Sequence, residues 1–173
     1  MATTGIWKIE KRLDNVLDYT TNVEKTINSE YGKDSYYDLH NVIDYVEADY
    51  KTEKQFYVSG VNCNPKTALE EMTITKEQFG KTGGILGFHA FQSFAEGEVT
   101  PEQCHAIGVR LAEEMWGDRF EVVVSTHLNT NHYHNHFVIN SVSFKDGKRY
   151  YDKRDTYAEL RRLSDSLCEE YGL

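Results

Sequence analysis

The chain has 173 residues and a formal net charge of −9 at pH 7. This length suits one domain with a hydrophobic core, and no apolar run approaches the ~20 residues that a membrane helix needs. The N-terminus lacks the apolar segment of a signal peptide. The cysteines at 63, 104 and 168 include no Cys-x-x-Cys pair, which excludes a cysteine zinc site of that type and favours a reducing cytoplasm. The acidic balance argues mildly against nucleic acid as a partner.

The first half of the chain alternates predicted strands and helices. In chain order we expect a strand at 6–13, a short helix at 13–21 and a polar turn-rich segment at 22–34. A helix capped by Asp34 or Ser35 should then run to 46. A strand at 56–63 is followed by a helix from 66 to about 79, with Pro65 in its first turn. Residues 81–84 read as a loop because they contain two glycines.

The second half begins with a predicted strand at 85–94. Thr100, Pro101 and Gln103 form a helix-start signature, and this helix should run to Trp116 and stop at Gly117. A hairpin follows over 120–144. A turn at 146–147, a short strand at 149–151 and a last helix capped by Asp155 or Thr156 complete the chain.

These elements predict an α+β fold: a mostly antiparallel sheet of about five strands with helices packed mainly on one face. One hairpin face carries Val122, Val124, Phe137 and Ile139, which should pack against helices. The other face carries histidines with Ser125 and Asn140, and we expect it to be the open side that meets a ligand.

Three histidines are predicted to meet on that hairpin. The polar cluster 129–132 marks its turn, and a turn centred between Thr130 and Asn131 pairs His127 with His134. His136 lies two residues further along the same face. Three converging imidazoles suit a divalent cation with open coordination positions. We expect His40 and His105 to be structural and His132 to be an exposed turn residue.

The histidine pattern resembles motif III of conjugative relaxases, in the histidine–hydrophobe–histidine (HUH) superfamily of single-strand DNA endonucleases. Here Asn135 stands where the superfamily name implies a hydrophobe, but the run from His134 to Asn140 is a common form in tyrosine relaxases of mobilisable elements. Residues 88–94 followed by 97–101 resemble motif II. Residues 16–19, with Asn22 and 24–26, resemble motif I.

The resemblance implies nicking and rejoining of one DNA strand at an origin of transfer, through a 5′-phosphotyrosyl intermediate and a divalent metal, Mg²⁺ or Mn²⁺. It implies Tyr19 as the nucleophile, with Tyr31, Tyr36 and Tyr37 as alternatives. The expected metal ligands are His127, His134 and His136. Asn129 occupies a position that is often Asp in the family, and unlike Asp it cannot act as a base. The chain would be a single relaxase domain, residues 1–173, at the N-terminal end of a longer protein.

The expected partners are single-stranded or hairpin origin DNA, accessory relaxosome proteins and a coupling protein. Candidate DNA contacts come from motif I, motif II and the locally basic segment 145–162; they are Lys25, His89, Gln92, Ser93, Lys148, Arg149, Arg154, Arg161 and Arg162. Three alternatives stay open: a replication initiator of the same superfamily, a non-catalytic DNA-binding module with a structural metal, and a metal hydrolase that uses water.

Overall fold

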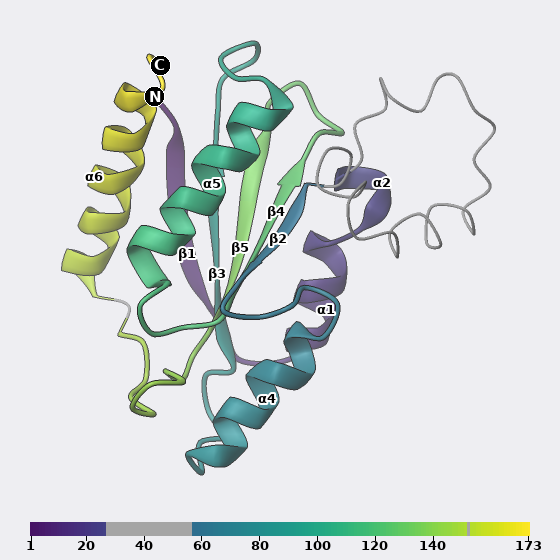
Figure 1. Ribbon diagram of the computed structural model, residues 1–173, viewed down its shortest axis with the longest axis vertical. Coiled ribbons are helices and arrows are strands. Elements are labelled where there is room, and N and C mark those ends of the chain that lie inside the picture. Colours follow the sequence, from purple (N-terminus) through teal and green to yellow (C-terminus); the bar gives the residue numbers. More distant parts are fainter. Residues whose placement is uncertain (27–56, 152) are drawn as a thin grey trace.

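A computed structural model describes residues 1–26, 57–151 and 153–173 (Figure 1). Its centre is a five-stranded, fully antiparallel sheet in the order β1-β3-β5-β4-β2. The strands are β1 (Thr3–Ile9), β2 (Val58–Val61), β3 (Gly87–Ser93), β4 (Val122–His127) and β5 (His134–Asn140). The helices are α1 (Leu13–Thr20), α2 (Val23–Thr26), α4 (Ala68–Gln78), α5 (Pro101–Trp116) and α6 (Arg154–Glu170). The predicted fold class is therefore confirmed.

The elements with the clearest sequence signals, α5 and the β4–β5 hairpin, lie where the sequence predicts them. Thr100 and Gln103 form a reciprocal capping box at the start of α5, and Gly117 caps its end. The predicted register of the β4–β5 hairpin is confirmed, since His127 pairs with His134. The first strand was misplaced: it begins at Thr3 and ends at Ile9. Residues 149–151 form no strand beyond an isolated bridge between Val142 and Arg149.

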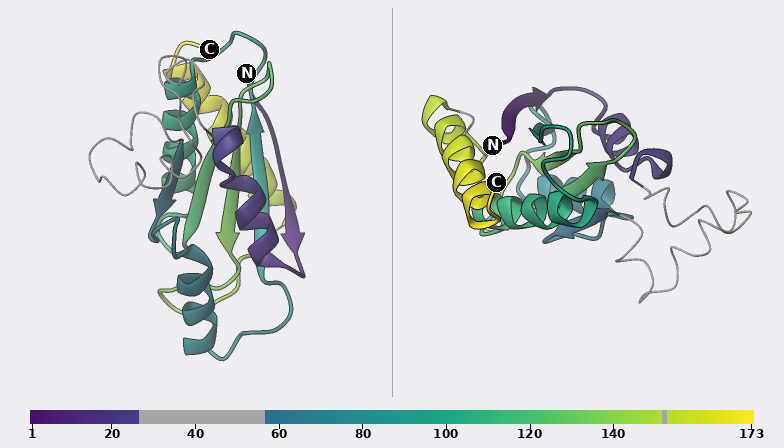
Figure 2. Two further views of the ribbon diagram at one scale, coloured as in Figure 1. Left: turned by 90° about the vertical axis from the view of Figure 1, so that its right-hand side faces the viewer. Right: turned by 90° about the horizontal axis from the view of Figure 1, so that it is seen from above.

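The two faces of the sheet are covered by different helices. Leu111 of α5 and Leu160 of α6 join the main core, which is built on Val124, Phe137 and Ile139. A smaller core on the histidine face joins Leu17 of α1 and Met72 of α4 to Val123 and Val138. Figure 2 shows α1 across the face away from α5 and α6. The histidine face is thus only partly open, because α1 and α4 cover part of it.

Two predictions fall on residues that the structure does not describe. The helix predicted after Asp34 or Ser35, together with His40, lies outside the described residues, as do the alternative nucleophiles Tyr31, Tyr36 and Tyr37. Among the described residues, no helix is long and apolar enough to cross a membrane.

Candidate metal centre and nucleophile

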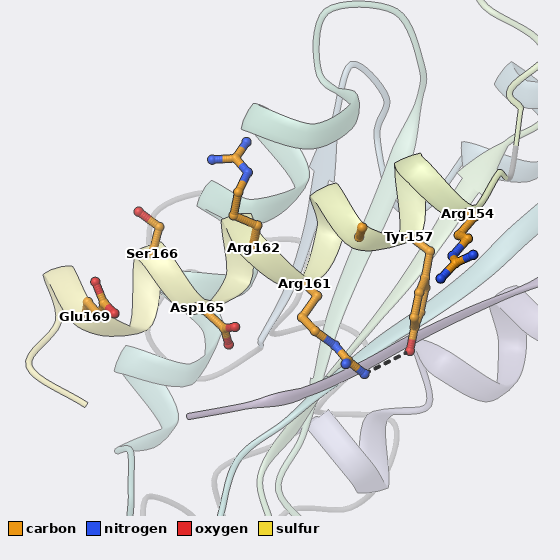
Figure 3. Close-up of a pocket in the computed structure, with 8 residues that line it drawn as sticks. Arg154, Tyr157, Arg161, Arg162, Asp165, Ser166 and Glu169 are labelled. Carbon is orange, nitrogen blue, oxygen red and sulfur yellow. Dashed lines mark hydrogen bonds between the residues drawn. The ribbon is translucent and has the colours of Figure 1, made fainter.

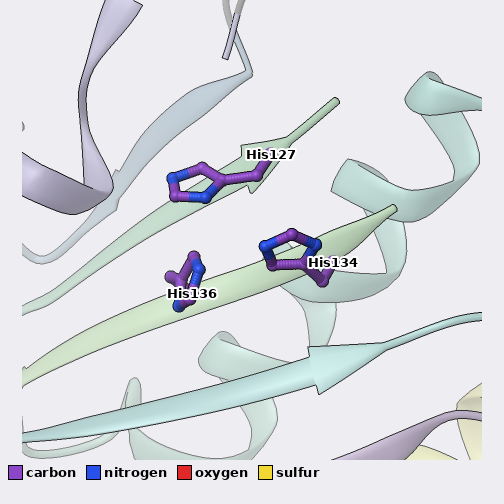
Figure 4. A group of neighbouring side chains, drawn as sticks. All are labelled: His127, His134 and His136. Atoms are coloured by element: carbon purple, nitrogen blue, oxygen red, sulfur yellow. The ribbon is translucent and has the colours of Figure 1, made fainter. Parts of the chain in front are cut away.

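Three histidines meet where β4 ends and β5 begins (Figure 4). The ring centroids lie 4.3 Å apart for His127 and His136, 5.0 Å for His134 and His136, and 5.1 Å for His127 and His134. One ring nitrogen from each lies within 4.8 Å of the others. The predicted convergence of the three side chains is confirmed, because the hairpin register and the two-residue period of a strand together fix it.

Each of these three histidines has one ring nitrogen in a hydrogen bond. His127 donates from Nε2 to the carbonyl of Thr20 at 2.9 Å, and His134 donates from Nδ1 to the carbonyl of His132 at 2.9 Å. A carbonyl only accepts, so in the neutral form of each ring these contacts leave Nδ1 of His127 and Nε2 of His134 unprotonated. In His136, Nδ1 lies 2.8 Å from Nε2 of His89.

The electrostatics of the cluster favour neutral imidazoles. The pKa of His127 is lowered to about 4 and that of His136 to about 2, mainly by burial and in smaller part by the neighbouring histidines. A neutral imidazole has the lone pair that binds a metal. Nε2 of His136 is buried and has no hydrogen-bond partner among the described residues. A cation at the cluster would satisfy this atom, so the residues present fit the divalent metal that the sequence predicted.

Tyr19 lies beside the cluster at the end of α1. Its ring packs edge-on with centroids 5.7 Å from His127 and 6.0 Å from His136, and the residue is 53% exposed. The ammonium of Lys25 sits 3.4 Å from the centroid of the Tyr19 ring. The phenol is therefore both next to the candidate metal ligands and open to a large substrate.

The docking of α1 and α2 on the hairpin explains this placement. The Thr20 carbonyl, at the last residue of α1, would lack a partner in the helix, and His127 supplies one. The Asn22 side chain accepts from the backbone N–H of Glu24 at the start of α2. Leu128, just past β4, donates its backbone N–H to the Lys25 carbonyl at 2.7 Å. These bonds hold Tyr19 and Lys25 against the end of β4.

Two motif II residues, Gln92 and His89, are buried in the structure. Gln92 is fully buried on the face of the sheet that α5 and α6 cover. Its side chain donates to the Ser164 hydroxyl and accepts a hydrogen bond from the Asn135 amide. His89 is 7% exposed and faces His136. Both side chains therefore have partners inside the protein, and their contact with DNA stays a prediction. Ser93 is half-buried and pairs with His134, so it stays at the edge of the cluster.

The residues around the histidines in sequence lie apart from the cluster. Asn129 and His132 are exposed in the turn, and none of the hydrogen bonds within the described ranges joins Asn129 to a histidine. Asn135 is fully buried on the opposite face, where it bonds Thr126 and the Cys104 carbonyl. His105 is structural as expected, with hydrogen bonds to the hydroxyls of Ser59 and Thr126.

The basic candidates divide into two groups. Arg149 donates to the carbonyls of Gly83 and Ile85, and Lys148 pairs with Asp146 at 3.8 Å, so both already have local partners. Three arginines instead line a hollow of about 550 Å³ on α6; they are Arg154, Arg161 and Arg162. In Figure 3, Arg154 and Arg161 extend toward β1 while Arg162 points away from it.

Sequence reasoning missed the residues behind the cluster. The partners of the three histidines are the Thr20 carbonyl, the His132 carbonyl and the His89 ring. His89 and Ser93 share a face of their predicted strand, which is a detectable signal. The pairing of that strand with β5 is not, because it joins residues 47 positions apart.

Comparisons with known proteins identify the family of this chain. The family model for the MobA/VirD2-like relaxase nuclease domain matches residues 23–173, beginning four residues after Tyr19. Protein rlx of Staphylococcus aureus is 41% identical over 115 residues, which cover 66% of this chain and 36% of that protein. The group II intron-interrupted relaxase LtrB of Lactococcus lactis subsp. cremoris is 29% identical over an alignment covering 94% of this chain and 35% of that protein.

The fold also resembles a solved structure from work on the molecular basis of vancomycin resistance transfer in Staphylococcus aureus. The TM-score is 0.61 at 12% identity, and the match covers 100% of this chain and 95% of that chain. This likeness shows a shared fold. The chain spans about a third of the length of the two curated relatives above. It belongs to the MobA/VirD2-like relaxases, and residues 23–173 match their nuclease domain.

Proposed function

We propose that this chain nicks and rejoins one strand of DNA at an origin of transfer, with Tyr19 as the nucleophile. Family membership supports the type of reaction. The observation that carries the proposal is the position of the half-exposed Tyr19 ring against two of the three clustered histidines. A nucleophile and a cation site on one surface are what phosphoryl transfer to a protein side chain requires.

In the proposed reaction, the Tyr19 oxygen bonds to the scissile phosphorus and the bond from phosphorus to the 3′-oxygen breaks. The phenolic proton passes to solvent, and the departing oxygen becomes a free 3′-OH after taking up a proton. The reverse step reseals the strand without an energy source, because the phosphodiester energy is kept in the phosphotyrosyl bond. Lys25 holds the Tyr19 ring in place and adds a positive charge near the phosphate.

His127, His134 and His136 would hold the divalent metal. When bound, such an ion neutralises charge that develops on the phosphate oxygens. Mg²⁺ prefers oxygen ligands and gives up its waters reluctantly, so three nitrogen donors favour Mn²⁺ of the two expected ions. Coordination positions beyond three remain for the oxygens of the DNA.

The substrate is expected to be single-stranded or hairpin origin DNA, and in the cell accessory relaxosome proteins and a coupling protein would act with the complete protein. The three cysteines are free, which supports a reducing compartment such as the cytoplasm. Asn129 remains a candidate contact from the exposed turn rather than a base.

The test is formation of a covalent adduct. The protein is incubated with labelled oligonucleotides that carry candidate origin sequences and Mn²⁺, and the products are separated on a denaturing gel. Wild type should give a protein–DNA band that Tyr19→Phe loses. Tyr171→Phe, which removes the same hydroxyl from the far end of α6, should keep it.

The outcomes separate the alternatives. An adduct that survives Tyr19→Phe would move the nucleophile to another tyrosine. Cleavage without any adduct would indicate a hydrolase that uses water. DNA binding with neither cleavage nor adduct across the candidate origins would indicate a non-catalytic binding module. The family match already argues against a replication initiator.

A further inference from the structure

A second layer of side chains lies behind the histidine cluster. His89 on β3 places Nε2 2.8 Å from Nδ1 of His136, with ring centroids 4.9 Å apart. The ring of Trp7 on β1 packs edge-on against His89, with centroids 4.4 Å apart. Three rings therefore follow one another across β1, β3 and β5, and the last of them is a candidate metal ligand.

The proton in the bond between His89 and His136 can sit on either ring. If His89 donates, Nδ1 of His136 is the acceptor, and a neutral His136 must then carry its proton on Nε2. In that tautomer Nε2 of His136, which lacks a hydrogen-bond partner, would have no lone pair with which to bind a metal. If His136 donates from Nδ1, its Nε2 is unprotonated and can bind a cation. The choice of tautomer therefore decides whether the third ligand works.

We propose that His89 is a positioning residue: its Nε2 accepts a hydrogen bond from the Nδ1–H of His136, which leaves the Nε2 lone pair of His136 free to bind the metal. The proposal rests on the proposed metal-assisted function. His127 and His134 have backbone carbonyls in the corresponding role. His136 lies inside the sheet, where both neighbouring strands pair with it, so a side chain from β3 takes that place.

An imidazole differs in one respect from the carboxylate that often fills this role behind a metal-binding histidine. It accepts the hydrogen bond without adding a negative charge. The full charge of the ion then remains available to the phosphate, which suits a chain with net charge −9 that must attract a polyanion. His89 is therefore a neutral partner in a position where a carboxylate is common.

The first test measures metal binding without DNA. Mn²⁺ is titrated into the metal-free protein by calorimetry, for wild type, His89→Phe, His89→Gln and the control Phe91→Leu. Phe91 pairs with His136 and also packs against Trp7, so its loss disturbs the same surroundings without removing an acceptor. His89→Phe should bind 10- to 100-fold more weakly, as is typical when such a partner is lost. His89→Gln, whose amide oxygen can accept, should recover most of the affinity, and Phe91→Leu should stay near wild type.

The second test needs no variant. Nitrogen-15 NMR of the metal-free wild type reports which ring nitrogen of His136 carries the proton, and the proposal requires Nδ1. A proton on Nε2 would overturn it even if His89→Phe failed to fold. Equal affinities of wild type and folded His89→Phe would also overturn it. A wild type that binds no Mn²⁺ would instead remove the metal-assisted function on which the proposal rests.

Discussion

His105 lies on α5, on the face of the sheet opposite the cluster, and links two strands. Its ring nitrogens bond the hydroxyl of Ser59 on β2 at 2.7 Å and that of Thr126 on β4 at 2.8 Å. The Tyr57 ring packs edge-on against it at 5.5 Å. Burial lowers the pKa of His105 to about 4, so the folded protein holds this ring neutral at pH 7. The same residue type thus serves as a strand link on one face and a candidate ligand on the other.

This low pKa predicts how stability depends on pH. In the unfolded chain a histidine has a pKa near 6.5, so between about pH 6.5 and 4 the unfolded state binds more protons at this residue. The free energy of unfolding should therefore fall as the pH drops through that window. Above about pH 6.5, the stability that depends on neutral His105 should be fully present. His105→Gln should remove roughly 1.4 kcal/mol of the fall between pH 7.5 and 5.5.

Urea unfolding of metal-free protein at several pH values checks this expectation. His132→Gln is the matched control, because it removes an exposed histidine from the turn. If His105→Gln lost stability on acidification as steeply as wild type, His105 would not be the group that takes up the proton.

At the scale of elements, the histidine hairpin depends on how closely α5 approaches it. Gly108 of α5 lies directly over Asn135, the residue between His134 and His136. A Cβ at position 108 would lie 2.5 Å from the Asn135 amide nitrogen. Asn135 cannot move aside easily, since it is fully buried and bonds Thr126, Gln92 and the Cys104 carbonyl.

Gly108→Ala should therefore disturb both the core and the metal ligands. Alanine favours a helix by up to about 1 kcal/mol over glycine, but overpacking typically costs about 1–3 kcal/mol, so we expect net destabilisation. We also expect weaker Mn²⁺ binding, because β5 must shift. Gly83→Ala is the control, since a Cβ there meets no atom within 4 Å. A stable Gly108→Ala protein with unchanged Mn²⁺ affinity would show that the contact is not restrictive.

Some features of these elements could be predicted from the sequence and others could not. The hairpin register follows from a short polar turn, so the approach of His127 to His134 could be predicted. The start of α5 follows from Thr100, Pro101 and Gln103. The pairing of β3 with both β1 and β5 involves distant segments, and it alone brings Trp7 and His89 behind His136. Side-chain roles that depend on such pairing, including that of Gln92, could not be predicted from local pattern.

At the scale of the whole molecule, the proposed function requires an acidic chain to bind a polyanion. Some cations are already paired with carboxylates: Arg110 pairs with Glu114 and Glu170, and Arg119 pairs with Asp146. In the part of the chain that the structure describes, Arg154 and Arg161 have no carboxylate within ion-pair distance, and both extend toward β1 (Figure 3). We therefore expect α6 beside β1 to contribute phosphate contacts, together with Lys25 near Tyr19.

Salt dependence tests this arrangement. Each phosphate contact to a single strand contributes about −0.7 to the slope of log K against log salt concentration. Arg161→Gln should therefore make the slope shallower by roughly 0.7, and the double variant with Arg154→Gln by about twice that amount. Arg110→Gln should leave the slope unchanged, because that guanidinium is already paired with two carboxylates. The measurement is fluorescence anisotropy of a labelled origin oligonucleotide over a range of salt concentrations. A wild-type slope near zero, or equal slopes for Arg161→Gln and wild type, would place the DNA on another part of the surface.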